Sequence, residues 1–337
     1  MFEFEILKCH ASGSDFVLLD TSRFSKEFLT KKNQSALAIQ LCDRKGIIGA
    51  DGCIFIQQTP DGASIEVFAP NGELIGFCIN AARCAARFVF ENSGKQKQCI
   101  ILLFPAGTIH VQFLEIGTNG LWRMCLENIC GIRTLDKTET ERNYVTEFRK
   151  IVQQNGSNDI NSNLVYGVWL GAPYLFCFSE ILHENTLKLL SLRFNANREP
   201  SDTSNITFIK DLGDDAIYLH TFERNGIGIS QSCDAAAVSA TFLKINSGNL
   251  KDTPIIKVYS SGGMLSVKWK ADERGLSASI HADCSYVYKG KVLYNSHTDT
   301  LKNVMQGELY FNEISNYGQF LDKQKSFIRE DSFLIRS

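Results

Sequence analysis

The stretch that decides the fold is Cys78-Ile79-Asn80-Ala81-Ala82-Arg83-Cys84-Ala85-Ala86-Arg87-Phe88, a run of small and apolar residues that opens with a cysteine. A second run of this kind opens with Cys233 and continues Asp234-Ala235-Ala236-Ala237-Val238-Ser239-Ala240. Each run ends in Asn-Ser-Gly, at Gly94 and Gly248, and is followed by an apolar run, a glycine turn and an alternating run. Two copies of one unit predict two pseudo-symmetric halves.

Both runs are apolar around nearly their whole circumference. A helix without a polar face is buried, so each run is expected to form the central helix of its half, with Gly94 and Gly248 as C-terminal stops. Arg83 and Arg87, one turn apart, are expected to pair with buried carboxylates or carbonyls, and the alternative is that one of them supports catalysis. The many short strand patterns around each run predict an α+β fold, with a barrel-like sheet wrapped around each central helix.

The repeat also suggests where the halves divide. The first half is expected to span 1–127, joined by a late strand near 283–294. The second half is expected to span 128–282 and to include a polar linker at 131–163, with one surface helix near Val145 to Gln154. The tail at 295–337 belongs to neither copy of the repeat, and its role cannot be read from the sequence.

Bulk composition excludes several classes of partner. The chain has 337 residues, and its 35 basic and 37 acidic side chains give a net charge of −2. This balance offers no electrostatic reason to expect nucleic acid or an anionic membrane surface. No apolar stretch is long enough to span a membrane, and the first residues lack the pattern of a signal peptide. We therefore expect a cytoplasmic protein without nucleic-acid or membrane partners.

Eleven cysteines raise the question of disulfides or metal sites. Without a secretion signal, a disulfide framework is not expected. There is no Cys-x-x-Cys, and Cys125 and Cys130 have no histidine nearby, so no metal site is predicted. Most of these thiols are expected to be small buried hydrophobic residues.

Cys78 and Cys233 differ from the other cysteines because each is expected to precede a buried helix by one or two residues. Backbone N–H groups and the helix dipole at such a position favour thiolate over thiol and also bind a carboxylate. The pair could hold an amino-acid α-carbon between two sulfurs, one thiolate acting as base and the opposing thiol as acid. No pyridoxal cofactor would be required. The alternative is that each cysteine is only a small residue at a tight strand-to-helix turn.

Motifs outside the two runs resemble those of a known family, diaminopimelate epimerase. The motifs occur in the same order as in the family, and the resemblance extends from about Phe4 to Tyr294. They are Lys8-Cys9-His10-Ala11-Ser12-Gly13-Ser14-Asp15-Phe16, Asp43-Arg44, Gly49-Ala50-Asp51-Gly52, Phe68 to Gly72, Gly171-Ala172-Pro173-Tyr174, Phe222-Glu223-Arg224 and Ser261-Gly262-Gly263. The resemblance implies a cofactor-free two-base mechanism with Cys78 and Cys233 as the acid–base pair. It also implies a role in making precursors of lysine and peptidoglycan.

The resemblance further implies the substrate-binding residues. Glu223 and Arg224 are expected to face a small amino acid, Arg224 holding a distal carboxylate, while Asn80 and Asn205 line the site. Four further positions are assigned to substrate binding, Ser14, Ala81, Asp234 and Ala235, and Tyr174 is assigned a supporting role. Whether two copies form a homodimer stays open.

Several residues depart from the family pattern. Cys-Gly-Asn-Gly becomes Cys78-Ile79-Asn80-Ala81, and Asp234 puts a negative charge beside the expected carboxylate site, which disfavours both a carboxylate and a second thiolate. Gly-Asn-Pro-His becomes Gly171-Ala172-Pro173-Tyr174. Two substrate-binding asparagines are replaced by Ser14 and Ala69, and Ile229 stands where the family has glutamate. These changes predict an altered substrate.

Two alternatives stay open. One is a paralogue that keeps the fold, has lost catalysis and binds a small molecule or a protein; Asp234, Tyr174 and the missing asparagines favour it. The other is an isomerase that shifts a double bond, as in the phenazine-biosynthesis branch of this superfamily. The cysteine pair argues against that second alternative.

Overall fold

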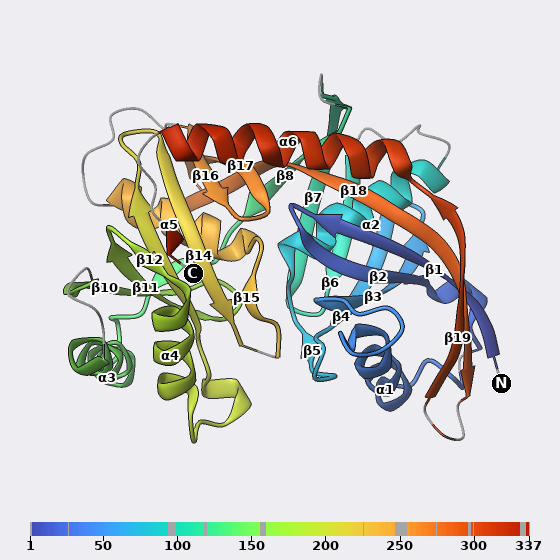
Figure 1. The fold of residues 1–337 in the computed structure, drawn as a ribbon, viewed down its shortest axis with the longest axis horizontal. Coiled ribbons are helices and arrows are strands. Elements are labelled where there is room, and N and C mark those ends of the chain that lie inside the picture. Colours follow the sequence, from blue (N-terminus) through green and yellow to red (C-terminus); the bar gives the residue numbers. More distant parts are fainter. Residues whose placement is uncertain are drawn as a thin grey trace. The chain divides into compact units, whose positions relative to one another are not determined.

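The structure, a computed structural model, describes residues 2–25, 27–93, 99–117, 120–155, 160–224, 226–246, 255–273, 275–295, 298, 300–330 and 335–336. The chain divides into two compact units (Figure 1). The first consists of Met1–Asn128 and His281–Phe320, and the second of Ile129–Ile280 and Leu321–Ser337. Gly94 and Gly248, expected as helix stops, lie outside the described residues.

The first unit is an eight-stranded closed barrel. Its elements are β1 (Phe2–Ala11), β2 (Ser14–Asp20), α1 (Lys31–Cys42), β3 (Gly52–Thr59), β4 (Gly62–Phe68), β5 (Leu74–Ile75), α2 (Ile79–Asn92), β6 (Cys99–Phe104), β7 (Gly107–Ile116) and β8 (Trp122–Ile129). The late strand β18 (Gly275–Asn295) pairs with both β1 and β8. The order β1-β2-β3-β4-β6-β7-β8-β18 therefore returns to β1 and closes the barrel.

The second unit repeats this plan. Its elements are β9 (Arg133–Thr134), α3 (Glu139–Asn155), β10 (Ile160–Trp169), β11 (Pro173–Ser179), β12 (Leu182–His183), α4 (Glu184–Asn195), β13 (Asn205–Asp211), β14 (Ala216–Glu223), β15 (Gly228–Ser230), α5 (Asp234–Asn246), β16 (Ile255–Ser260) and β17 (Gly263–Asp272). The pairs β1–β2, β3–β4 and β6–β7 are antiparallel, as are β10–β11, β13–β14 and β16–β17. The pairs β2–β3 and β4–β6 are parallel, as are β11–β13 and β14–β16.

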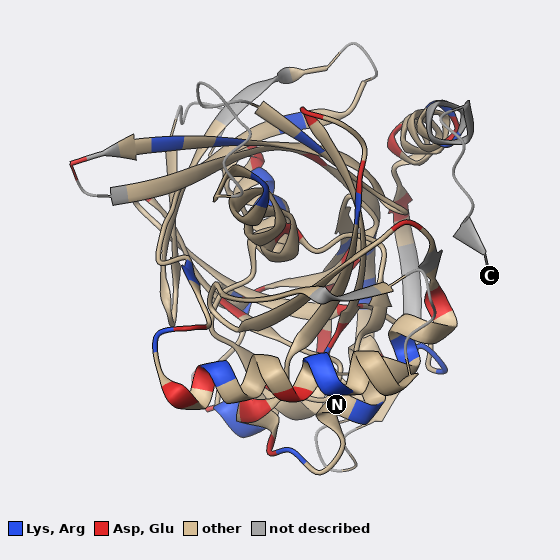
Figure 2. Cartoon of the chain, turned by 90° about the vertical axis from the view of Figure 1, so that its left-hand side faces the viewer, with Lys and Arg blue, Asp and Glu red and all other residues tan. Residues whose placement is uncertain are grey.

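The central helices occupy equivalent places in the two units. Helix α2 lies between β5 and β6 in the chain, and α5 lies between β15 and β16. Every residue of α2 from Ile79 to Arg87 is buried, as is every residue of α5 from Ala236 to Leu243. Figure 2, which looks onto the side of the molecule where α3, α4 and α5 are labelled in Figure 1, shows one helix enclosed by strands, with charged residues concentrated on the helices outside. The predicted α+β fold of two pseudo-symmetric halves, each wrapped around an apolar helix, is confirmed.

Two segments differ from the sequence interpretation. The helix expected near Val145 to Gln154 is present as α3, but it is longer than expected, and its Val145, Phe148 and Val152 belong to the hydrophobic core of the second unit. The sequence of this segment is polar overall because only one face of the long helix is apolar. One apolar face is enough for the helix to pack against the barrel. The tail contains β19 (Thr300–Leu309), which pairs with β18, and α6 (Phe311–Glu330). Within the described residues, no helix combines the length and the hydropathy that a membrane span needs.

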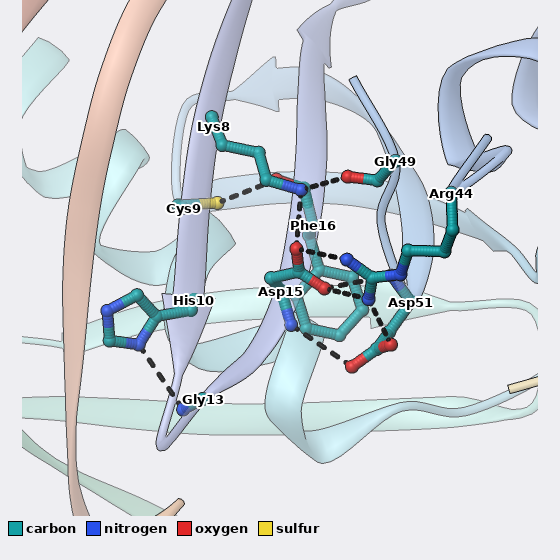
Figure 3. Close-up of polar contacts among 9 residues, drawn as sticks. All are labelled: Lys8, Cys9, His10, Gly13, Asp15, Phe16, Arg44, Gly49 and Asp51. Carbon is teal, nitrogen blue, oxygen red and sulfur yellow. Dashed lines mark hydrogen bonds and ion pairs between the residues drawn. The ribbon is translucent and has the colours of Figure 1, made fainter. Parts of the chain in front are cut away.

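A polar network fixes the outer face of the first barrel (Figure 3). Asp15 accepts hydrogen bonds from Lys8 Nζ at 2.6 Å and from both terminal nitrogens of Arg44, at 2.5 and 3.0 Å. Arg44 Nη2 also lies 2.6 Å from Asp51 Oδ1, and Lys8 donates to the Gly49 carbonyl. The motif residues Lys8, Asp15, Arg44 and Asp51 thus join β1, β2 and the segment that leads from α1 into β3.

Removing the Asp15 charge should destabilise the protein. Burial alone would raise the pKa of Asp15, but hydrogen bonds from Arg44 and Lys8 and their charges hold it below its ordinary value. We expect Asp15→Asn to lower the free energy of unfolding by about 3 kcal/mol at pH 7, since it breaks a largely buried ion pair. Because the pKa is depressed, this loss should shrink as the pH falls through the folded-state pKa and Asp15 itself becomes neutral.

Denaturant unfolding of the variant at pH 7 and at pH 3 tests this prediction. The control is Glu5→Gln, which breaks an ion pair with Arg23 whose side chains are 57% and 60% exposed, and which should cost less than about 1 kcal/mol. Equal losses of unfolding free energy in the two variants would show that the Asp15 network stabilises the protein no more than an exposed ion pair does.

Candidate active site

Cys78 stands at the N-terminus of the first central helix. It is the N-cap residue of α2, with extended φ and ψ of −140° and 109°, and its carbonyl accepts the Ala82 N–H at 3.1 Å. Its side chain is half-buried, whereas Asn80 and Ala81 in the first helical turn are buried. The first N–H groups of a helix have no partner within the helix, so this end carries partial positive charge.

The β1–β2 turn is tied to the same helix. Ser12 and Gly13 adopt positive φ of 48° and 83°, and the buried Ser14 begins β2. Arg83, three residues after Asn80, donates from Nη1 to Ser12 Oγ at 3.0 Å and to the Asp283 carbonyl at 2.5 Å. This contact confirms the prediction that Arg83 pairs with a buried carbonyl. It also links the helix that carries Cys78 and Asn80 to the turn that precedes Ser14.

Cys233 occupies the corresponding position in the second unit. It directly precedes α5, is 9% exposed, and its carbonyl accepts the Ala237 N–H at 2.9 Å. Tyr174 Oη lies 3.8 Å from Cys233 Sγ, and both side chains are buried. Asp234, the first residue of α5, is fully buried, and Ala235 is half-buried. A cavity of about 10 Å³ beside Cys233, lined in part by Thr221, has room for about one water molecule.

The protonation state of Cys233 differs from the sequence expectation. Burial raises the pKa of this thiol well above its ordinary value, and the negative charges of Glu223 and Asp234 raise it further. The Ala236 N–H and the Tyr174 hydroxyl act in the opposite direction but do not outweigh burial. The expectation that the helix N-terminus would favour thiolate is therefore wrong for Cys233 in this state. At neutral pH its sulfur is a thiol, which suits a proton donor.

Asn205 and Arg224 form a connected pair in the second unit. Asn205 begins β13, directly opposite Tyr174 in the parallel pairing with β11, and its Oδ1 accepts the Arg224 backbone N–H at 3.0 Å. Arg224 Nη1 donates to the Pro200 carbonyl at 2.8 Å and lies 3.3 Å from Thr203 Oγ1. Asn205 therefore holds the backbone that follows Glu223, and the Arg224 side chain is held by hydrogen bonds to the turn at 200–203.

The structure thus groups the candidate residues unit by unit. In the first unit, Cys78, Asn80 and Ala81 share one helix end, and Arg83 connects it to the turn before Ser14. In the second unit, strand pairing, hydrogen bonds or electrostatic effects on Cys233 link the remaining candidates, which are Tyr174, Asn205, Glu223, Arg224, Cys233, Asp234 and Ala235. Sequence reasoning missed the link from Arg83 to Ser12. The arginine inside an otherwise apolar helix indicated that it has a buried partner, but the sequence did not identify that partner.

The reactivity of Cys233 should respond in opposite directions to two neighbouring substitutions. Tyr174→Phe removes a donor to the sulfur and should raise its pKa, whereas Asp234→Asn removes a negative charge and should lower it. Because only thiolate is alkylated, the rate at pH 8 should fall in the first variant and rise in the second, each by up to about tenfold for a pKa change of about one unit.

Iodoacetamide labelling with peptide mapping measures these rates, and Cys78 in the same sample is the internal reference. In every variant the Cys233 rate should rise with pH, because the raised pKa leaves the thiolate as the minor form. Changes of the same sign in both variants would contradict the electrostatic account of this site.

The chain is similar to known proteins both in sequence and in fold. No family model matches the chain. The diaminopimelate epimerase of Listeria monocytogenes serotype 4b (strain F2365) is 27% identical over 312 residues, covering 86% of this chain and 88% of the relative. The structure of a predicted epimerase from Pseudomonas aeruginosa superposes with a TM-score of 0.65 at 12% identity, covering 87% of this chain and all of that one. A PhzF-family phenazine biosynthesis protein from Bacillus anthracis superposes with a TM-score of 0.63 at 13% identity and the same coverage.

The two solved structures show the fold, and the curated relative adds a match in sequence along most of both chains. Over most of its length the chain is similar in sequence to bacterial diaminopimelate epimerases, and it shares its fold with the two solved structures.

Proposed function

We propose that this protein is a cofactor-independent amino-acid epimerase or racemase in which Cys78 and Cys233 act on one α-carbon from opposite faces. One cysteine, as thiolate, removes the α-proton, and the other, as thiol, protonates the opposite face. The N–H groups at the starts of α2 and α5 hold the α-carboxylate and stabilise negative charge as it develops there. Asn80, Ala81, Asp234 and Ala235 contribute to this carboxylate site through their backbone N–H groups, whereas the Asp234 side-chain charge opposes binding.

One observation carries the proposal. Each cysteine lies at the N-terminus of a buried central helix, at equivalent positions of a strand-pairing pattern that occurs twice in the chain. A tight turn into a buried helix requires only a small residue, so packing alone gives no reason for cysteine at both places. The raised pKa of Cys233 supports its assignment as the thiol that donates the proton for one isomer, with Cys78 as the base, and the two roles are exchanged for the other isomer.

The proposed substrate is an amino acid with a simple acidic or polar end rather than diaminopimelate. Arg224 and Glu223 supply charges suited to a distal group, and the Arg224 guanidinium can bind a carboxylate at two points. In the family that the sequence resembles, three side-chain amides can hydrogen-bond a second amino-acid centre. The residues at these positions are here Ser14, Ala69 and Ala172. We further propose that the protein works in the cytoplasm, where thiols stay reduced. All eleven cysteines lie in the described ranges, and none is in a disulfide.

Incubation in D2O with a panel of amino acids tests the activity. Proton NMR should show loss of the α-proton signal for at least one acidic or polar amino acid, and chiral chromatography should show that both isomers form. No loss for any amino acid, with intact folding, would leave the second candidate function, a binding protein that has lost catalysis. The buried Asp234 charge next to Cys233 favours that candidate, so Asp234→Asn should be tested in the same assay.

A further inference from the structure

The tail helix α6 is anchored to the first central helix by a buried ion pair. Arg87 of α2 is 2% exposed and donates from Nη1 and Nη2 to the two carboxylate oxygens of Glu313, at 2.5 and 2.6 Å. Glu313 Oε2 also accepts the Tyr286 backbone N–H at 2.9 Å. The Arg87 guanidinium lies 3.6 Å from the centre of the Tyr286 ring. A two-point contact of this kind fixes both the distance and the orientation of its partners.

One turn later, α6 makes a second contact with the same unit. The ring of Tyr317 lies 4.2 Å from the ring of His10, centre to centre. His10 Nδ1 accepts the Gly13 N–H at 3.3 Å, so the histidine supports the β1–β2 turn. Burial lowers the pKa of His10 to about 4, and it stays neutral and able to accept this hydrogen bond at physiological pH. Gly13 directly precedes Ser14.

We propose that the first half of α6 is a positioning element of the Cys78 site: Glu313 holds the central helix through Arg87, and Tyr317 holds the β1–β2 turn through His10. The two contacts converge on the two elements that carry Cys78, Asn80 and Ser14. These elements are joined to each other by Arg83 and Ser12. Residues 311–320 belong to the same compact unit as α2 and β1. This inference rests on the proposed function and gives a role to a tail that the repeat does not explain.

A positioning role predicts a catalytic effect larger than the loss of stability explains. Displacing a reacting group by about 1 Å can cost about 100-fold in rate, because the reacting atoms must be aligned. We therefore expect Glu313→Gln to lower kcat/KM by about 10- to 100-fold at a temperature where the variant is fully folded. The matched control is Glu308→Gln, which removes a surface carboxylate 3.9 Å from Lys289 and should leave kcat/KM unchanged.

Tyr317 allows a test by rescue. Tyr317→Phe keeps the ring that contacts His10, whereas Tyr317→Ala removes it. We expect Tyr317→Phe to retain at least half of the wild-type kcat/KM and Tyr317→Ala to lose about tenfold or more, chiefly as a higher KM because the turn before Ser14 is loosened. Thermal melting of each variant, followed by circular dichroism, ensures that the assays are made well below the unfolding transition.

Hydrogen exchange supplies a readout that does not depend on activity. In Glu313→Gln and Tyr317→Ala, peptides covering 79–92 and 9–16 should exchange faster than in the wild type, while the peptide covering 234–246 in the second unit should not change. Wild-type kcat/KM in both variants, or equal acceleration of exchange in both units, would overturn the inference. If the wild type inverts no amino acid but exchange responds only in the first unit, the proposed function fails and the positioning role of α6 stands.

Discussion

Replacing either cysteine of the proposed pair with alanine will abolish inversion while leaving the fold intact. Each sulfur serves one face of the α-carbon, so neither can replace the other. General acid or base catalysis contributes about 10²- to 10⁴-fold, and we expect Cys78→Ala and Cys233→Ala each to lower kcat by at least about 10³-fold. Chiral chromatography of the product and circular dichroism of each variant provide the two measurements.

Cys84→Ala is the matched control for these variants. Cys84 lies on the same helix as Cys78 and is fully buried, but it is well inside α2 rather than at its N-terminus. It should retain inversion activity, with only a packing effect on stability. Full activity in Cys78→Ala or in Cys233→Ala would contradict the assignment of two bases.

Diaminopimelate will be a poor substrate compared with an amino acid that has a single acidic or polar end. Each missing hydrogen bond to a charged group costs about 1.5–3 kcal/mol, so the three positions occupied by Ser14, Ala69 and Ala172 should together lower kcat/KM by at least about 10³-fold. Steady-state kinetics with LL-diaminopimelate and with a panel of simpler amino acids measure this ratio. Efficient turnover of LL-diaminopimelate with little activity on the simpler amino acids would contradict this prediction. It would indicate that the protein makes precursors of lysine and the cell wall.

The same reasoning assigns the distal group to Arg224. Arg224→Met should raise KM for the preferred substrate by about tenfold or more, because a charge-assisted two-point contact is lost. The substitution also removes the contacts of Nη1 with Pro200 and Thr203. Thr203→Val controls for this effect, because it removes one of these hydrogen bonds and leaves the guanidinium in place. A KM unchanged by Arg224→Met would exclude a distal carboxylate at this residue.

The repeated units could be predicted because their signals are local. A run of mostly small apolar residues such as Ala81 to Ala86 is typical of a buried helix, and its recurrence after Cys233 predicts the second unit. The position of each cysteine at a helix start follows from the same pattern. The strand pairing agrees, since the parallel and antiparallel pairs occur in the same order in both units.

The remaining features depend on partners that are distant in the chain. Arg87 and Glu313 are 226 residues apart, and no periodicity in the tail indicates that α6 docks on the first unit. A helix was expected near Val145 to Gln154, but not that α3 packs into the core: its apolar face is narrow among many charges, yet Phe148 is fully buried. The pKa of Cys233 shows the same limit: the helix N-terminus and the Asp234 charge are visible in the sequence, but the burial that raises the pKa most is set by the whole barrel.

The most direct test of the two-base account is the isotopic fate of the α-proton in the first turnovers. One isomer of the preferred amino acid, unlabelled, is incubated in D2O with the wild-type protein, and both isomers are separated and examined by mass spectrometry below about 10% conversion, where the reverse reaction is negligible. If separate cysteines serve the two faces, the product isomer will carry deuterium at the α-carbon while the remaining substrate stays unlabelled, since the proton taken by one sulfur never reaches the other face. Product that retains the original proton, or equal labelling of both isomers from the start, would show that one base serves both faces and would contradict the account.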